Sequence, residues 1–170
     1  MEFAYRPELW RELFDMTALA AVTLTGLLSV GLSINLRSIR GSAAHRARAR
    51  EALISLTVLL IVSIFVMIPE QGRVALGIEL VVLSVLVWVL SLRLQSETLQ
   101  HLPAHQRRRW GRRLIGLDAA ILAITLAGIS LALGRFGGFL WLLPQILIGL
   151  VWSTYNAWNL LIEVVEESIE

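Results

Sequence analysis

Long apolar runs constrain this chain more than any other feature of its sequence. A membrane-spanning helix needs about 20 mostly apolar residues to cross about 30 Å of hydrocarbon. Five runs of this kind occur in the 170-residue chain, at about residues 14–36, 53–68, 74–92, 114–133 and 139–165. They are apolar on all sides, whereas the strands of membrane barrels alternate apolar and polar residues. The sequence therefore predicts an all-α polytopic membrane protein, with one domain (1–170) built as a bundle of five transmembrane helices.

The composition agrees with this fold class. The chain is 56% hydrophobic and only 16% charged, whereas a soluble domain is near half apolar and about a quarter charged. Too few polar residues remain to coat a globule, which excludes a conventional soluble enzyme. Cysteine is absent, and no phosphate-binding loop, zinc-protease motif or nucleophile elbow occurs. We therefore expect a protein that is not an enzyme, without catalytic residues, a metal site or a cofactor.

The arginines predict the orientation of the chain, since all 15 basic residues are arginine. Eleven of them lie in two segments between apolar runs: Arg37, Arg40, Arg46, Arg48, Arg50, Arg93, Arg107, Arg108, Arg109, Arg112 and Arg113. The positive-inside rule places both segments, which we expect to be loops, in the cytoplasm. The N-terminus is then outside and the C-terminus cytoplasmic. The clustered arginines thus indicate topology, and we expect no nucleic-acid partner.

The connections on the opposite side are short. Residues 69–72 and 134–138 are rich in proline and glycine, which break helices and form turns. They predict two tight helical hairpins. Residues 1–15 either lie along the outer interface as an amphipathic helix or extend the first span; the second interpretation is favoured because no breaker separates Pro7 from Leu36.

Polar residues at membrane depth are the candidate functional residues, because a buried carboxylate is costly in a bilayer. Glu79 lies near the outer surface and Asp118 near the inner one, so the two cannot pair within one chain. At the level of Glu79 lies Gln145, and a polar pocket open to the outside is expected there. The full set of intramembrane polar candidates is Asn35, Glu79, Asp118, Gln145, Asn156, Asn159 and Glu163. Either these residues form hydrogen bonds that fix the bundle, or Glu79 holds a proton or cation.

The first run contains a regular stripe of small residues, which recur every four positions: Thr17, Ala21, Thr25, Ser29 and Ser33. This spacing lets two helix backbones approach closely. The stripe is either a packing seam, with its hydroxyls bonded to preceding carbonyls, or the lining of an aqueous path. Shorter seams of the same kind run from Ala120 to Ala132 and from Gly149 to Ala157.

Several short segments resemble a group of small bacterial membrane proteins, some of which carry the name "modulator of FtsH protease". The segments are Ser-Ile-Asn-Leu at 33–36, Arg-Glu-Ala-Leu at 50–53, Pro-Glu-Gln at 69–71, Gly-Ile-Glu-Leu at 77–80 and Asn-Ala-Trp-Asn-Leu-Leu-Ile-Glu at 156–163. The resemblance implies a location in a bacterial plasma (inner) membrane. The residues matching the family motifs are Asn35, Gln71, Glu79, Asn156, Asn159 and Glu163.

These observations favour a homo-oligomeric channel or conducting pore, because five helices hardly enclose a wide path alone. In this hypothesis the stripe of the first span lines the path, Glu79 lies near its outer mouth, and the partners are the lipid bilayer, further copies of the chain and ions. The alternative is a non-catalytic regulatory or scaffold subunit. Such a subunit would dock on a membrane protein partner, such as a membrane protease, through its seams and its acidic tail.

Overall fold

The structure is a computed structural model in which every regular element of the described residues is a helix. It describes the backbone of residues 2–34, 36–41, 43–100 and 104–167, and the side chains of residues 4–34, 36, 39, 41, 45–96 and 118–158. The long helices are α1 (Arg11–Ile34), α3 (Ala43–Met67), α4 (Arg73–Gln100), α5 (Ala104–Leu133) and α6 (Leu142–Glu167). Short helices connect them: η1 (Glu2–Tyr5), η2 (Pro7–Leu9), α2 (Leu36–Gly41) and η3 (Gly138–Trp141). The predicted all-α class is confirmed for these residues.

Four helical stretches in the described part of the chain are long and apolar enough to cross a membrane: Arg11–Ile34, His45–Met67, Arg73–Ser96 and Gly138–Trp158. The described apolar part of α5, Asp118–Leu133, is shorter. The helices are therefore compatible with a multi-pass membrane protein.

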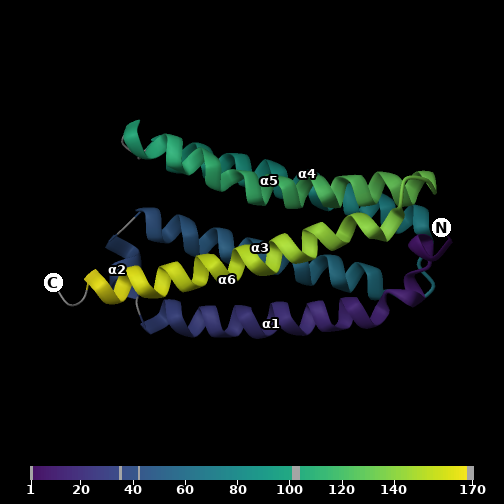
Figure 1. Cartoon of the computed structure of the whole chain (residues 1–170), viewed down its shortest axis with the longest axis horizontal. Helices are drawn as coiled ribbons and strands as arrows, with labels where there is room; N and C mark the ends of the chain where they lie inside the picture. Colours follow the sequence, from purple (N-terminus) through teal and green to yellow (C-terminus); the bar gives the residue numbers. More distant parts are fainter. Residues whose placement is uncertain (1, 35, 42, 101–103, 168–170) are drawn as a thin grey trace.

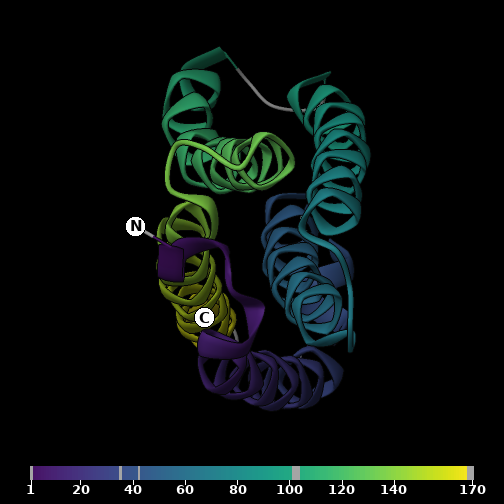
Figure 2. The same cartoon turned by 90° about the vertical axis from the view of Figure 1, so that its right-hand side faces the viewer.

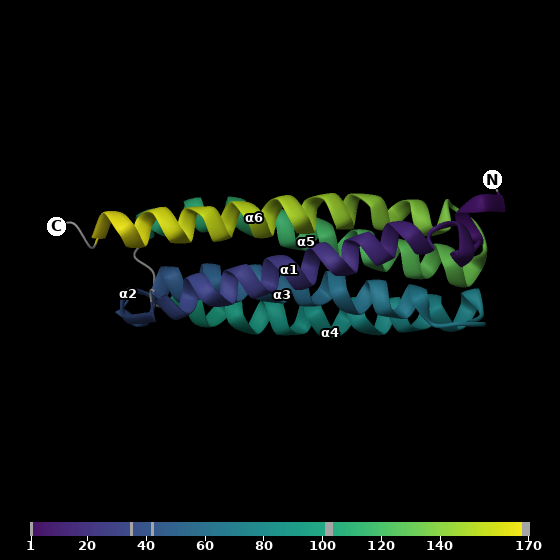
Figure 3. The same cartoon turned by 90° about the horizontal axis from the view of Figure 1, so that it is seen from below.

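The long helices run antiparallel in three layers (Figure 1, Figure 2). Helix α1 forms one outer layer, α3 and α6 form the middle layer, and the α4–α5 pair forms the other outer layer, as the contacts between these elements require. Viewed from below, α3 and α4 lie on one side of α5 and α6, and α1 runs obliquely between the two pairs (Figure 3). Because α3 and α6 contact helices on both sides, they contribute many of the buried residues, such as Leu56, Leu59, Val62 and Ile146.

The α4–α5 pair is held at very short range by glycines. A Cβ atom built on Gly77 would lie 2.6 Å from the carbonyl oxygen of Gly128 and 2.8 Å from the nitrogen of Ala132. Such a close approach lets two helix backbones make van der Waals contact along their length. The small-residue seam predicted for the fourth span is thus used inside the chain.

The seam predicted for the fifth span is also an internal contact, between α6 and α3. Here Leu59 of α3 packs 3.0 Å from the position of a Cβ on Gly149. One turn away, the hydroxyl of Ser55 donates a hydrogen bond to the carbonyl of Gly149 at 3.4 Å. Neither of these two seams therefore indicates contact between different copies of the chain.

The two predicted hairpin turns are confirmed. Between α3 and α4 the chain reverses through Glu70, which has a φ of 58°. Between α5 and α6 it reverses through Gly134, Phe136, Gly137 and Gly138, all with positive φ. The Ser130 hydroxyl fixes this second turn, since it accepts a hydrogen bond from the Gly138 amide at 2.7 Å and donates one to the Arg135 carbonyl.

The sequence favoured a first span that extends back to Pro7, and the structure differs from this prediction. The N-terminal segment forms the two short 3-10 helices η1 and η2, and α1 begins at Arg11. The segment crosses the α5–α6 turn, where the Tyr5 hydroxyl accepts a hydrogen bond from the Gly137 amide at 2.9 Å. This tertiary contact ties the segment to the turn, and local propensity does not reveal it.

The arginine-rich segments are largely helical rather than loops. Helix α3 begins at Ala43, ahead of Arg46, Arg48 and Arg50, and α4 continues past Arg93 to Gln100. Alanine, arginine, leucine and glutamine are strong helix formers, and residues 43–52 and 93–100 contain neither glycine nor proline. At the arginine-rich end, α3, α4 and α5 extend beyond their apolar residues. The predicted spans at 53–68, 74–92 and 114–133 are therefore shorter than these helices.

Candidate functional site

The hydroxyl stripe of α1 is buried at one end and exposed at the other. Thr17 and Ala21 lie in the core, Thr25 is half-buried, and Ser29 and Ser33 are exposed. The hydroxyls of all four stripe residues that carry one donate to the carbonyl four residues earlier, at 2.7–2.8 Å. The predicted bonding to preceding carbonyls is therefore confirmed, but only the first half of the stripe is a packing seam.

The geometry of the helix explains why the stripe leaves the core. A step of four residues turns the side chain by about 400°, which is about 40° more than one full turn. Four such steps, from Thr17 to Ser33, turn it by about 160°. The buried face of α1 instead follows Phe14, Thr17, Ala21 and Leu28, whose spacing of three, four and seven keeps them on one side.

Glu79 has a different partner from the one expected. The amide nitrogen of Gln71 donates a hydrogen bond to its carboxylate, with 2.6 Å between Gln71 Nε2 and Glu79 Oε2. The α3–α4 turn places Gln71 above the first turns of α4, where it reaches a residue eight positions later. Gln145 is buried on α6, and no hydrogen bond joins it to Glu79 among the described residues. The polar contact at the start of α4 is thus local.

Glu79 and the stripe of α1 also lie apart. Glu79 is on α4 and the stripe is on α1, and these helices form opposite outer layers with α3 and α6 between them (Figure 2). One chain therefore cannot place Glu79 at the mouth of a path that its own α1 lines.

We expect the Gln71–Glu79 hydrogen bond to contribute measurably to stability. A hydrogen bond to a charged group contributes roughly 1.5–3 kcal/mol to stability when buried. Because Glu79 is only half-buried, we expect its bond with Gln71 to contribute about 1–2 kcal/mol. The variant Gln71→Leu should lower the free energy of unfolding in detergent by that amount. Gln95→Leu is the matched control, since Gln95 donates at 2.7 Å to the uncharged hydroxyl of Ser91 and should cost less. Equal effects of the two variants would contradict the expectation.

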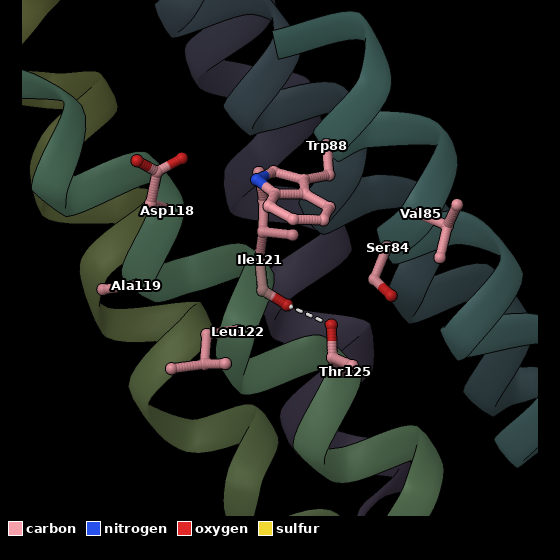
Figure 4. Close-up of a pocket in the computed structure, with 8 residues that line it drawn as sticks. All are labelled: Ser84, Val85, Trp88, Asp118, Ala119, Ile121, Leu122 and Thr125. Atoms are coloured by element: carbon pink, nitrogen blue, oxygen red, sulfur yellow. Dashed lines mark hydrogen bonds between the residues drawn. The ribbon is translucent and has the colours of Figure 1, made fainter. Parts of the chain in front are cut away.

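Asp118 lies near the middle of α5, beside the space between α4 and α5 (Figure 4). Its side chain is exposed, and it lines a cavity between the two helices together with Ser84 and Trp88 of α4. Counting residues along the apolar runs also places Asn35, Asn156, Asn159 and Arg113 or Arg112 at the depth of Asp118. Of these, only the side chain of Asn156 is described, and it is buried on α6.

Part of the predicted polar set cannot be placed. Asn159 and Glu163 belong to α6, but their side chains lie outside the described residues. The same is true of Asn35 and of the rest of the acidic tail, which is Glu166, Glu167 and Glu170. Among the described candidates, Glu79 contacts Gln71, Asp118 lines a cavity, and Gln145 and Asn156 are buried on α6. The structure therefore separates these residues and brings none of the described ones into a shared cluster.

The sequence missed the residues that share the cavity with Asp118. Ser84, Trp88 and Thr125 face it only because α4 and α5 meet in a particular register. The sequence did hold a signal for this register, namely the glycines at 77 and 128, where the backbones of α4 and α5 meet. Because the two helices are antiparallel, residues of α4 and α5 whose numbers add to about 205 lie opposite each other.

Comparisons with protein-family models, curated proteins and solved structures find no match for this chain. The resemblance to the "modulator of FtsH protease" group therefore stays a prediction.

Proposed function

We propose that the chain crosses a bacterial plasma membrane five times, with its N-terminus outside and its C-terminus in the cytoplasm. The antiparallel helices support this proposal, because the arginines at the start of α3 and the arginine near the end of α4 lie at the same end of the bundle. Arg11, Arg73 and Arg135 lie at the other end, where the α3–α4 and α5–α6 turns also lie (Figure 1). The end richer in arginine is the cytoplasmic one by the positive-inside rule.

We further propose that copies of the chain assemble through α1 and that a narrow path for ions forms along the contact. The observation that carries this proposal is the exposure of Ser29 and Ser33, with half-buried Thr25, on the outside of the bundle. Helix α1 is also the least covered of the four candidate spans: 17% of its apolar window is buried, against 39–44% in the others.

The exposed face of α1 suits both the assembly of copies and a path for ions. Nothing lies within 4 Å of a Cβ atom built on Gly26, so a second helix has room to approach closely there. Each hydroxyl donates to its own helix, but its oxygen keeps a lone pair that accepts from water or coordinates a cation. A path lined by such oxygens replaces part of the hydration shell of an ion.

Two measurements on the purified protein test the proposal. Its mass in lipid nanodiscs should exceed that of one chain, and liposomes containing it should pass monovalent cations faster than protein-free liposomes. Ser29→Leu and Ser33→Leu should each lower the flux about tenfold, because an apolar constriction expels water from a narrow path. Thr23→Leu is the matched control, since Thr23 is exposed on another face of α1 with the same type of hydrogen bond.

A monomeric mass together with flux no greater than that of empty liposomes would overturn the proposal. Equal loss of flux in Thr23→Leu and Ser29→Leu would also contradict it, because the path would then not follow the stripe.

A further inference from the structure

A cavity of about 650 Å³ lies between α4 and α5, on the other side of the bundle from α1. Its described lining is mostly apolar and includes Val85, Ile121 and Leu122. Val85 and Leu122 are about half exposed on the outer surface of the pair. The cavity therefore opens sideways, toward the lipid in a bilayer. Its volume lies in the range of sites that bind small molecules.

Asp118 is the charged residue among the described lining side chains. It lies fifteen residues before the end of α5 at Leu133, hence about 22 Å along the helix from the outer end. At that depth a carboxylate is within the hydrocarbon, where it is costly without a cation or a proton. No hydrogen bond or ion pair holds Asp118 within the described part of the chain, so the cavity presents a negative charge that a ligand can neutralise.

The other polar residues of the cavity also suit a positively charged ligand. Trp88 reaches from α4 into the space opposite Asp118 and is 52% exposed (Figure 4), so its ring face is available to a cation. The hydroxyls of Ser84 and Thr125 donate to carbonyls of their own helices, at 2.8 Å and 3.0 Å. What these two residues offer to a ligand is therefore oxygen lone pairs rather than donors.

We propose that this cavity binds a lipophilic organic cation, which enters from the membrane. The positive group lies between the Asp118 carboxylate and the Trp88 ring, and the apolar body contacts Val85, Ile121 and Leu122. A bare metal ion does not suit the site, because the described lining supplies one carboxylate in an apolar wall, which is too few ligands. An anion does not suit it either, because the charge and the ring face both repel one. This binding site is separate from the proposed path along α1.

The proposal is tested with tetraphenylphosphonium, a compact apolar cation, and with tetraphenylborate, an anion of the same shape. Equilibrium dialysis measures their binding to the full chain in nanodiscs against empty nanodiscs. We expect one saturable site per chain for the cation and none for the anion. Asp118→Asn should weaken cation binding about tenfold or more, since it removes the charge while keeping the shape. Asp15→Asn, at an exposed aspartate on α1 outside the cavity, should change it less than twofold.

A second variant keeps the test independent of the charge. Leu122→Trp leaves Asp118 in place but fills the cavity, and it should also abolish saturable binding while the chain elutes as the wild type does. Binding no stronger than that of empty nanodiscs, equal binding of the anion, or wild-type affinity in Asp118→Asn would each overturn the proposal. If Leu122→Trp instead changed the oligomeric mass and left binding intact, the cavity would be a contact between copies, and the proposal would be wrong.

Discussion

Replacing Gly77 by alanine should lower the free energy of unfolding by about 3 kcal/mol, the upper end of the range for overpacked cores. The added methyl group would lie 2.6 Å from the Gly128 carbonyl oxygen and 2.8 Å from the Ala132 nitrogen. Both atoms belong to the backbone of α5, so no side-chain rotation relieves the contact and the two helices must separate. Unfolding of the detergent-solubilised protein, followed by circular dichroism in increasing denaturant, measures the change.

Gly26→Ala is the matched control for this prediction. Nothing lies within 4 Å of its added methyl group, and alanine is favoured over glycine inside a helix by roughly 0.5–1 kcal/mol. Gly26→Ala should therefore leave the stability of the single chain unchanged or raise it, whereas Gly77→Ala lowers it. A similar response of the two variants would show that the α4–α5 contact is looser than the structure has it.

The helices could be predicted from the sequence because their cause is local. Apolar length identifies a candidate span, and the proline and glycine at 69 and 72 end one helix and allow the next. The helix ends at the arginine-rich side could not be found in this way. There the helix continues through Arg46, Arg48 and Arg50 because of helix propensity, after the apolar pattern has stopped.

The candidate sites were harder to predict, because depth along a helix does not give direction around it. Counting residues put Gln145 level with Glu79, but the hydrogen-bond partner of Glu79 is Gln71, from the adjoining turn. Similarly, a four-residue repeat in α1 suggested one continuous face, although its drift carries Ser33 away from the buried side. The cavity at Asp118 depends on the register of α4 against α5, which side-chain packing decides.

The contact between the N-terminal segment and the α5–α6 connection is the other place where a single change should have a large effect. Phe139 of η3 is fully buried, and its ring stacks on Trp10 at a centroid distance of 5.9 Å. The ring of Phe14, at the start of α1, lies 6.2 Å away at a tilt of 60°. Three aromatic rings thus join the beginning of the chain to the start of α6, across more than a hundred residues.

Phe139→Ala should lower the free energy of unfolding by about 3–5 kcal/mol, the cost of removing a buried aromatic ring and leaving a cavity. Phe136→Ala is the matched control, since Phe136 is 76% exposed three residues earlier and already has a positive φ as a non-glycine residue. It should change stability by less than about 0.5 kcal/mol. Because Trp10 contacts Phe139 directly, Trp10→Leu combined with Phe139→Ala should cost less than the sum of the two single changes. Additive costs would mean that the rings stabilise their two segments separately and do not join the N-terminal segment to η3.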